Sequence, residues 1–297
     1  LYIVRGVILK KDHLMSLKYL LILTVPIFIE LLLQLVVGYS DQFMMKKYEN
    51  AVNGITNANV INNMIINAFT VFSSAAIILI TQYKGAKDEN HERSVYSVAF
   101  YFNFIVSLVF SLIILGLGRF FLKWLQVPEL SYNDALLYLM ITGGLLFFQT
   151  MSTTLSSLLK ANSCMKESMV INLIVNLINI LGNYFLIKAF AKIDLPILGV
   201  AISSAGSRII GFILMFIIYI KKVGIPLSVK VFKSEMGQTG IKLLKLGAPS
   251  GGESVSYNSS QIIIQLCANQ IVKYNGNNIG MGNIKTYASM FAMVTYM

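Results

Sequence analysis

Three polar side chains share one face of the first apolar stretch of the chain. Glu30, Gln34 and Asp41 are separated by four and seven residues, so on a helix they fall within about 40° of one another. Charged groups inside a membrane are costly and tend to mark ion or substrate pathways. Carboxylate and amide oxygens can replace the water around a hard cation such as Na⁺, and a carboxylate can also carry a proton. The stripe indicates a polar pathway inside the membrane, with Pro26 one turn earlier as a candidate hinge.

Two further apolar stretches carry polar residues at helical spacing. The stretch near residues 168–190 contains Asn172, Asn176, Asn179 and Asn183. The stretch near residues 58–83 contains Asn59, Asn63, Asn67, Thr70 and Ser74. Such stripes either line a pathway or join helices through hydrogen bonds, and both interpretations stay open at this point.

Single residues also have structural interpretations beside the functional ones. Lys46 and Lys47 follow Asp41 closely, so this carboxylate would lie at the membrane surface if the span ended early. Pro26 would be a plain kink relieved by a neighbouring helix. Arg208, in the middle of another apolar stretch, would either form a structural bridge with an acid or lie on the transport pathway.

The composition indicates that these residues belong to helices that cross a membrane. The chain is 56% hydrophobic and 12% charged, its mean hydropathy is +0.70, and soluble domains carry roughly 25% charge. Several apolar stretches exceed about 18 residues, the length that crosses a bilayer as a helix. We predict an all-α membrane protein, a polytopic helix bundle with spans near 17–41, 58–83, 95–117, 134–158, 168–190, 196–220, 246–272 and 281–297.

A repeated pattern organises these spans. The motif L-L-x-L-x-x-P-x-x-x-E occurs at residues 20–30 and 243–253, an offset of 223 residues. It places Glu253 of the second copy where the first has Glu30. Six spans fit within the offset, so both copies run in the same direction, which predicts two six-helix lobes as parallel repeats. We expect a full protein of twelve spans and about 440 to 450 residues, of which this chain holds about eight spans.

The repeat also divides the chain into segments. We expect a cytoplasmic N-terminal segment (1–16), a first lobe of six transmembrane helices (17–220), a cytoplasmic inter-lobe linker (221–245) and the truncated start of a second lobe (246–297). Placing the N-terminus in the cytoplasm puts 15 Lys and Arg residues in inner segments and 8 in outer ones, as the positive-inside rule requires. The net charge of +11 then reflects topology and lipid contact, and a nucleic-acid partner is not expected.

Other chemistries find little support in the sequence. Cys164 and Cys267 fall on opposite sides of the predicted membrane and are not expected to pair. The two His residues form no metal cluster, so the only metal considered is Na⁺ at Asp41. There is no phosphate-binding glycine loop for ATP. We therefore expect a protein that is not an enzyme and has no cofactor, with Na⁺ or H⁺ as a coupling ion.

The order of these motifs resembles that of the multidrug and toxic compound extrusion (MATE) transporters. The resemblance covers residues 17 to 297, beginning with the stretch from Pro26 to Asp41 and the segment Thr81-Gln-Tyr-Lys-Gly-Ala86. Its most specific part is residues 158–208, with Asn176-Leu-Ile-Asn179-Ile-Leu-Gly-Asn183-Tyr, Leu198-Gly-Val-Ala201 and Ser207-Arg208.

The resemblance implies a twelve-helix antiporter with a cation site in the first lobe. Carried over residue by residue, that site comprises Asp41, Asn179, Asn183, Tyr138 and Ser207. Asn183 departs from members that have Asp there, which removes one carboxylate from a two-acid proton relay. A second departure is Tyr257, at a position where some branches have Glu. The intramembrane polar residues that remain as pathway candidates are Glu30, Gln34, Asn176, Arg208 and Glu253.

Three functions are weighed. The leading one is a secondary antiporter that exports organic cations, drugs or amphiphilic metabolites in exchange for Na⁺ or H⁺. The second is a flippase for lipid-linked oligosaccharides or other lipids, from the same superfamily, which would need a more cationic cavity. The third is a non-transporting scaffold, which has no need of buried carboxylates. We expect a multi-pass protein of a bacterial plasma membrane, monomeric when full length, whose partners are the lipid bilayer and a small amphiphilic or cationic substrate.

Overall fold

The protein is a bundle of long helices. The computed structural model describes residues 25, 28–29, 39–274 and 283. Within this part of the chain the helices are α2 (Glu49–Gly85), α3 (Glu89–Trp124), α4 (Glu129–Gly144), α5 (Leu146–Ala161), α6 (Met165–Ala191), α7 (Pro196–Lys222) and α8 (Val229–Tyr274). A short helical segment, residues 39–44, precedes α2. The described chain thus confirms the predicted all-α bundle.

The helices are joined by very short connections. Four of them contain one non-glycine residue in the left-handed region, with φ between 53° and 60°: Lys87, Gln126, Ser163 and Asp194. The longer connection from α7 to α8 turns at Gly224, with φ of 65°. A single left-handed residue ends a helix and reverses the chain. Each helix therefore runs back beside its predecessor, and the chain passes repeatedly from one end of the bundle to the other.

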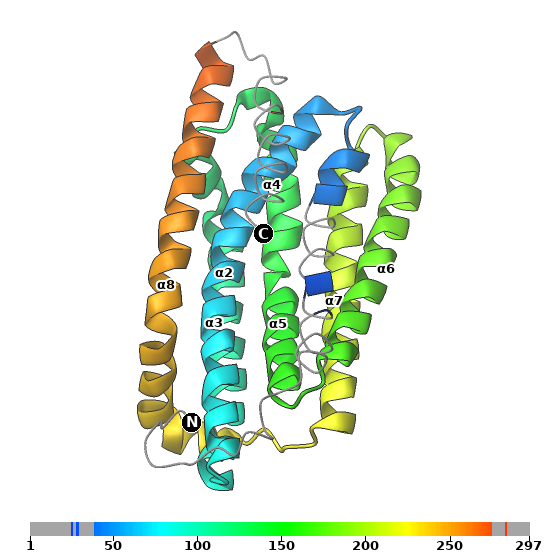
Figure 1. The fold of residues 1–297 in the computed structure, drawn as a ribbon. Coiled ribbons are helices and arrows are strands. Elements are labelled where there is room, and N and C mark those ends of the chain that lie inside the picture. The colour runs from blue at the N-terminus through cyan, green and yellow to red at the C-terminus, as the bar shows by residue number, and fades with distance from the viewer. Residues whose placement is uncertain (1–24, 26–27, 30–38, 275–282, 284–297) are drawn as a thin grey trace.

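The helices lie side by side, with α2 and α3 between α8 and the α4–α5 pair (Figure 1). α2 packs against α3, α4, α5 and α8, while α6 and α7 form the most extensive helix pair. α8 lies at one side of the bundle and the α6–α7 pair at the other (Figure 1). α2, α3, α6 and α7 are each long and apolar enough to cross a membrane, and α4 with α5 forms a fifth candidate span. α8 is more polar and is not among these candidates.

The α4–α5 span is bent by 45° at the break between the two helices. Leu145 occupies the break, and the backbone N–H of Phe147 donates to Ser111 Oγ on α3 at 3.1 Å. Ser111 thus supplies an acceptor that a straight helix would have provided, as a break inside a membrane requires. The adjacent Gly143 lets α3 approach closely, because a Cβ there would lie 2.7 Å from Ile114.

Six of the predicted spans fall on observed helices. The stretches 58–83, 95–117, 168–190 and 196–220 lie within α2, α3, α6 and α7, and 134–158 covers the α4–α5 pair. The stretch 246–272 lies within α8, which is one continuous helix with Pro249 inside it. Nearly all of the first predicted span, and all of the last except Asn283, lie outside the described residues.

The polar stripe predicted on α2 is only partly buried. Asn63, Thr70 and Ser74 are exposed and Asn59 is half-buried, while Asn67 Nδ2 donates to Asn258 Oδ1 on α8 at 3.0 Å. The buried polar residues of α2 are Asn53, Thr56, Asn57, Asn62 and Ser73. Several of them bond to other helices: Asn62 Nδ2 donates to Thr142 Oγ1 at 3.0 Å, and Asn57 Oδ1 accepts from Asn269 Nδ2 at 2.7 Å. Their role is to join α2 to α4 and α8.

The connection between α7 and α8 is held against the bundle. Tyr219 Oη donates to the carbonyl of Ile225 at 2.8 Å, and Tyr101 Oη donates to that of Leu227 at 3.2 Å. Ser97 Oγ accepts from the backbone N–H of Ser228 at 3.1 Å. The first part of the predicted linker is therefore an ordered strap, and its second part belongs to α8.

Candidate functional site

Asp41 lies buried where the short helical segment 39–44 meets three helices. Asp41 is only 7% exposed. Asp41 Oδ1 accepts from Asn183 Nδ2 on α6 at 2.7 Å. Asp41 Oδ2 accepts from Tyr138 Oη on α4 at 2.9 Å and from Ser204 Oγ on α7 at 2.7 Å. Three donors satisfy three of about four lone-pair positions on a carboxylate, which leaves room for one further partner.

Close packing of α6 on α7 brings two of these donors together. A Cβ at Gly199 would lie 2.6 Å from the backbone carbonyl of Leu186, and one at Gly182 would lie 2.4 Å from Ser203 Oγ. The two glycines therefore permit an approach that side chains would prevent, as small residues do at membrane helix interfaces. This approach places Asn183 and Ser204 within reach of one carboxylate.

Two amide oxygens beside Asp41 have no donor. Asn179 Nδ2 donates to Ser204 Oγ at 3.1 Å, and Ser203 Oγ donates to the Asn179 carbonyl at 2.8 Å. The buried Oδ1 atoms of Asn179 and Asn183 nevertheless have no hydrogen-bond partner among the described residues. Buried polar atoms are rarely left unpaired. Amide and carboxylate oxygens are ligands that a hard cation takes in proteins.

The structure brings together four of the five residues in the predicted cation site. Asp41, Tyr138 and Asn183 are in direct contact, and Asn179 joins them through Ser204. Ser207 is buried one turn away, and its Oγ donates to the carbonyl of Ser204 at 3.0 Å instead of to Asp41.

Sequence reasoning missed Ser204, which supplies the α7 donor. Ser203, Ser204 and Ser207 all lie in the same small-residue segment of α7. Helical spacing alone places Ser204 and Ser207 on overlapping faces. Which of the two serines meets the asparagine face of α6 depends on the rotation of α7 against α6, so the sequence holds no signal that selects Ser204.

The other predicted pathway residues are dispersed. Arg208 is partly buried on α7, and its NH1 donates to the Thr142 carbonyl at 3.0 Å. Asn176 lies on α6 on the same face as Asn179 and Asn183. Glu253 is exposed on α8, which packs chiefly against α2 and α3. Pro26, Glu30 and Gln34 lie outside the described residues.

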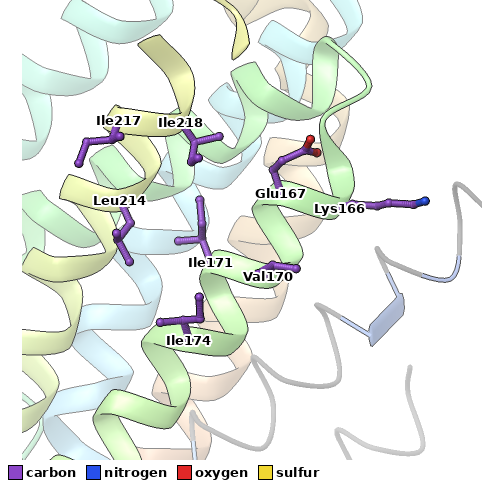
Figure 2. Close-up of a pocket in the computed structure, with 8 residues that line it drawn as sticks. All are labelled: Lys166, Glu167, Val170, Ile171, Ile174, Leu214, Ile217 and Ile218. Carbon is purple, nitrogen blue, oxygen red and sulfur yellow. The ribbon is translucent and has the colours of Figure 1, made fainter. Parts of the chain in front are cut away.

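An apolar groove lies elsewhere, between α6 and α7. It has a volume of 420 Å³. Figure 2 shows Ile171, Ile174, Leu214 and other aliphatic side chains along it, with Lys166 and Glu167 at one end. None of its lining residues contacts Asp41. An aliphatic lining suits a hydrocarbon chain and not a coupling ion.

Ser204→Ala is expected to destabilise the full-length protein by about 1.5–3 kcal/mol, because Ser204 Oγ donates to a buried charged group. Ser207→Ala is the matched control and should cost about 0.5–1.5 kcal/mol, since Ser207 Oγ donates to the neutral Ser204 carbonyl. The measurement is the free energy of unfolding in detergent. Equal losses in both variants would contradict direct contact of Ser204 with the Asp41 carboxylate.

The fold and the comparisons with known proteins identify the class of protein. An all-helical bundle with several candidate membrane spans defines a multi-pass membrane protein. The MatE family model matches residues 26–185, more than half of the chain. The chain therefore belongs to the MatE family of membrane transporters.

Individual relatives agree with this assignment. The chain is 33% identical over 246 residues to the uncharacterized transporter YisQ of Bacillus subtilis, an alignment that covers 82% of this chain and 54% of YisQ. It therefore spans about half the length of that curated relative. The MATE multidrug transporter DinF-BH has a similar fold, with a TM-score of 0.78 and 14% identity over 96% of this chain and 62% of that one. A MATE transporter in an inward-facing conformation gives a TM-score of 0.71 at 14% identity, covering 88% and 59%.

Proposed function

We propose that the full-length protein is a secondary active antiporter that exports organic cations, drugs or amphiphilic metabolites in exchange for Na⁺ or H⁺. Asp41 would be the coupling carboxylate. The observation that carries the proposal is a buried carboxylate held by three donors, with two asparagines around it whose buried amide oxygens have no donor among the described residues. No ion pair to Asp41 occurs in the described part of the chain. A cation would relieve the cost of both the buried charge and the unpaired oxygens.

The site also offers a way to link ion binding to movement. Its ligands come from four separate segments, namely residues 39–44, α4, α6 and α7. An ion bound by all four would favour the arrangement in which they are close, and its release would allow them to separate. A ligand shifts a conformational equilibrium by its difference in affinity for the two states. Transport by such a cycle involves no covalent catalysis.

The protein would lie in the plasma membrane with its N-terminus in the cytoplasm and function as a monomer. The distribution of charge supports this orientation. More Lys and Arg residues lie at the end of the bundle where α2 finishes and α6 begins than at the opposite end. Lys84, Lys160, Lys221 and Lys222 belong to the richer side. Positive residues collect on the cytoplasmic side of multi-pass proteins.

An efflux assay tests this function. Cells that express the full-length protein should accumulate less ethidium than control cells. One of two compounds, a sodium ionophore or a protonophore, should abolish this difference in ethidium accumulation. The compound that does so identifies the coupling ion. Ethidium efflux that persists with both gradients collapsed would contradict secondary transport.

A further inference from the structure

The Asp41 site has a second layer of polar residues next to it. Moving one turn along α4 leads from Tyr138 to Thr142, and one turn along α7 leads from Ser204 to Arg208. Because α6 runs antiparallel to α7, the equivalent step on α6 leads back from Asn179, which donates to Ser204, to Asn176. Four residues of helix advance by about 6 Å. The second layer lies nearer the end of the bundle at which α6 begins.

This second layer is rich in donors, whereas the first is rich in acceptors. Arg208 carries five N–H donors. Among the described residues one backbone carbonyl accepts from it, that of Thr142, at 3.0 Å. Asn176 Nδ2 is buried and has no acceptor among the described residues. Both unsatisfied groups require an acceptor, and the buried Oδ1 atoms of Asn179 and Asn183 beside Asp41 require a donor or a cation.

Arg208 offers charge and N–H donors to a ligand. It lies near the middle of α7, a candidate membrane span, and it is partly buried and so remains accessible. The buried Asp41 carboxylate attracts it electrostatically, but no carboxylate lies within ion-pair distance of it among the described residues. A cation bound at Asp41 would neutralise that carboxylate and leave the guanidinium without a counter-charge at membrane depth, which is costly unless an anion binds it. The planar fork of the guanidinium matches carboxylate and phosphate oxygens.

We propose that Arg208 and Asn176 form a subsite for the acidic group of an amphiphilic substrate, a carboxylate or a phosphate on an apolar tail. The inference rests on the proposed transport function and specifies one class of its substrates, acidic amphiphiles, beside the organic cations that would bind without this subsite. The cation at Asp41 and the acidic group at Arg208 would then occupy adjacent layers of one cavity. Binding of one would favour the other through their opposite charges.

Equilibrium binding to the purified full-length protein tests the subsite without any gradient. The probes are dansyl-labelled undecanoate and a matched dansyl-labelled undecyl-trimethylammonium, titrated by fluorescence. Arg208→Gln should weaken binding of the carboxylate probe about tenfold or more, as expected for loss of charge-assisted hydrogen bonds. It should leave the trimethylammonium probe within about twofold, and Arg208→Lys should give an intermediate loss because Lys keeps the charge without the fork.

Two further arms keep the inference falsifiable. Asn176→Ala should weaken the carboxylate probe about threefold even if Arg208→Gln fails to fold. Dodecyl phosphate should displace the carboxylate probe and inorganic phosphate should not, if the ligand is an amphiphile. Two results would overturn the subsite and leave Arg208 as a counter-charge to Asp41. One is unchanged binding of the carboxylate probe in both Arg208→Gln and Asn176→Ala. The other is that Arg208→Gln changes only the binding of the trimethylammonium probe, making it tighter. Neither result would affect gradient-driven transport through Asp41, which is measured separately.

Discussion

Asp41→Asn in the full-length protein is expected to lower ion-driven transport at least about a hundredfold, because an interaction of about 3 kcal/mol corresponds to that factor. The substitution keeps the shape of the side chain and removes its charge. It also replaces one acceptor by an NH₂ group that faces the donors of Asn183, Tyr138 or Ser204. Both effects remove the oxygen set that would hold a cation.

The control for this variant is Asp194→Asn. Asp194 is exposed in the α6–α7 connection with φ of 57°, a conformation that Asn adopts readily. Transport by this variant should equal that of the unmodified protein. If Asp41→Asn retained normal ion-driven transport while remaining folded, the coupling carboxylate would have to lie elsewhere, and Glu30 would be the next candidate on the same helical stripe.

Gly199→Val is expected to destabilise the full-length protein by about 1–3 kcal/mol or more, the usual cost of overpacking. The new Cβ would meet backbone atoms of Leu186 and Ile187 at 2.6 to 2.9 Å, and a backbone cannot rotate away as a side chain can. α6 and α7 must therefore separate, which moves Asn183 away from Ser204 and disrupts the Asp41 contacts.

The matched control is Gly206→Ala on the same helix. Among the described residues, no atom outside the surrounding turns of α7 lies within 4 Å of a Cβ built at Gly206, and Ala is favoured over Gly inside a helix by about 1 kcal/mol. Thermal unfolding in detergent should show a lower midpoint for Gly199→Val and an unchanged or higher one for Gly206→Ala. A normal midpoint and normal transport in Gly199→Val would show that the α6–α7 contact is less tight than the structure indicates.

Much of the fold follows from the sequence because hydropathy and length decide which segments cross a membrane. Runs of apolar residues correctly located α2, α3, α6 and α7. Helical spacing also predicted that Asn179 and Asn183 would lie on one face, and the structure places that face toward Asp41. The bend between α4 and α5 was less accessible, since it depends on Ser111 of another helix accepting the freed N–H of Phe147.

The failures have a common physical cause. Periodicity defines which residues share a face and leaves open which neighbour that face meets. On α2 it selected Asn63, Thr70 and Ser74, which are exposed, while Asn57 and Asn62 are the residues that bond to other helices. On α7 it did not distinguish Ser204 from Ser207. Those choices depend on how adjacent helices are rotated and on the glycines that let them approach.

The most direct test is a flux measurement on full-length protein in proteoliposomes, with Na⁺ and pH gradients imposed separately. The predicted result is that one of the two gradients drives accumulation of a fluorescent amphiphile by the unmodified protein. The same gradient should drive none in Asp41→Asn, while Asp194→Asn behaves normally. Accumulation that ignores both gradients, or that proceeds equally in Asp41→Asn, would contradict a coupling site at Asp41.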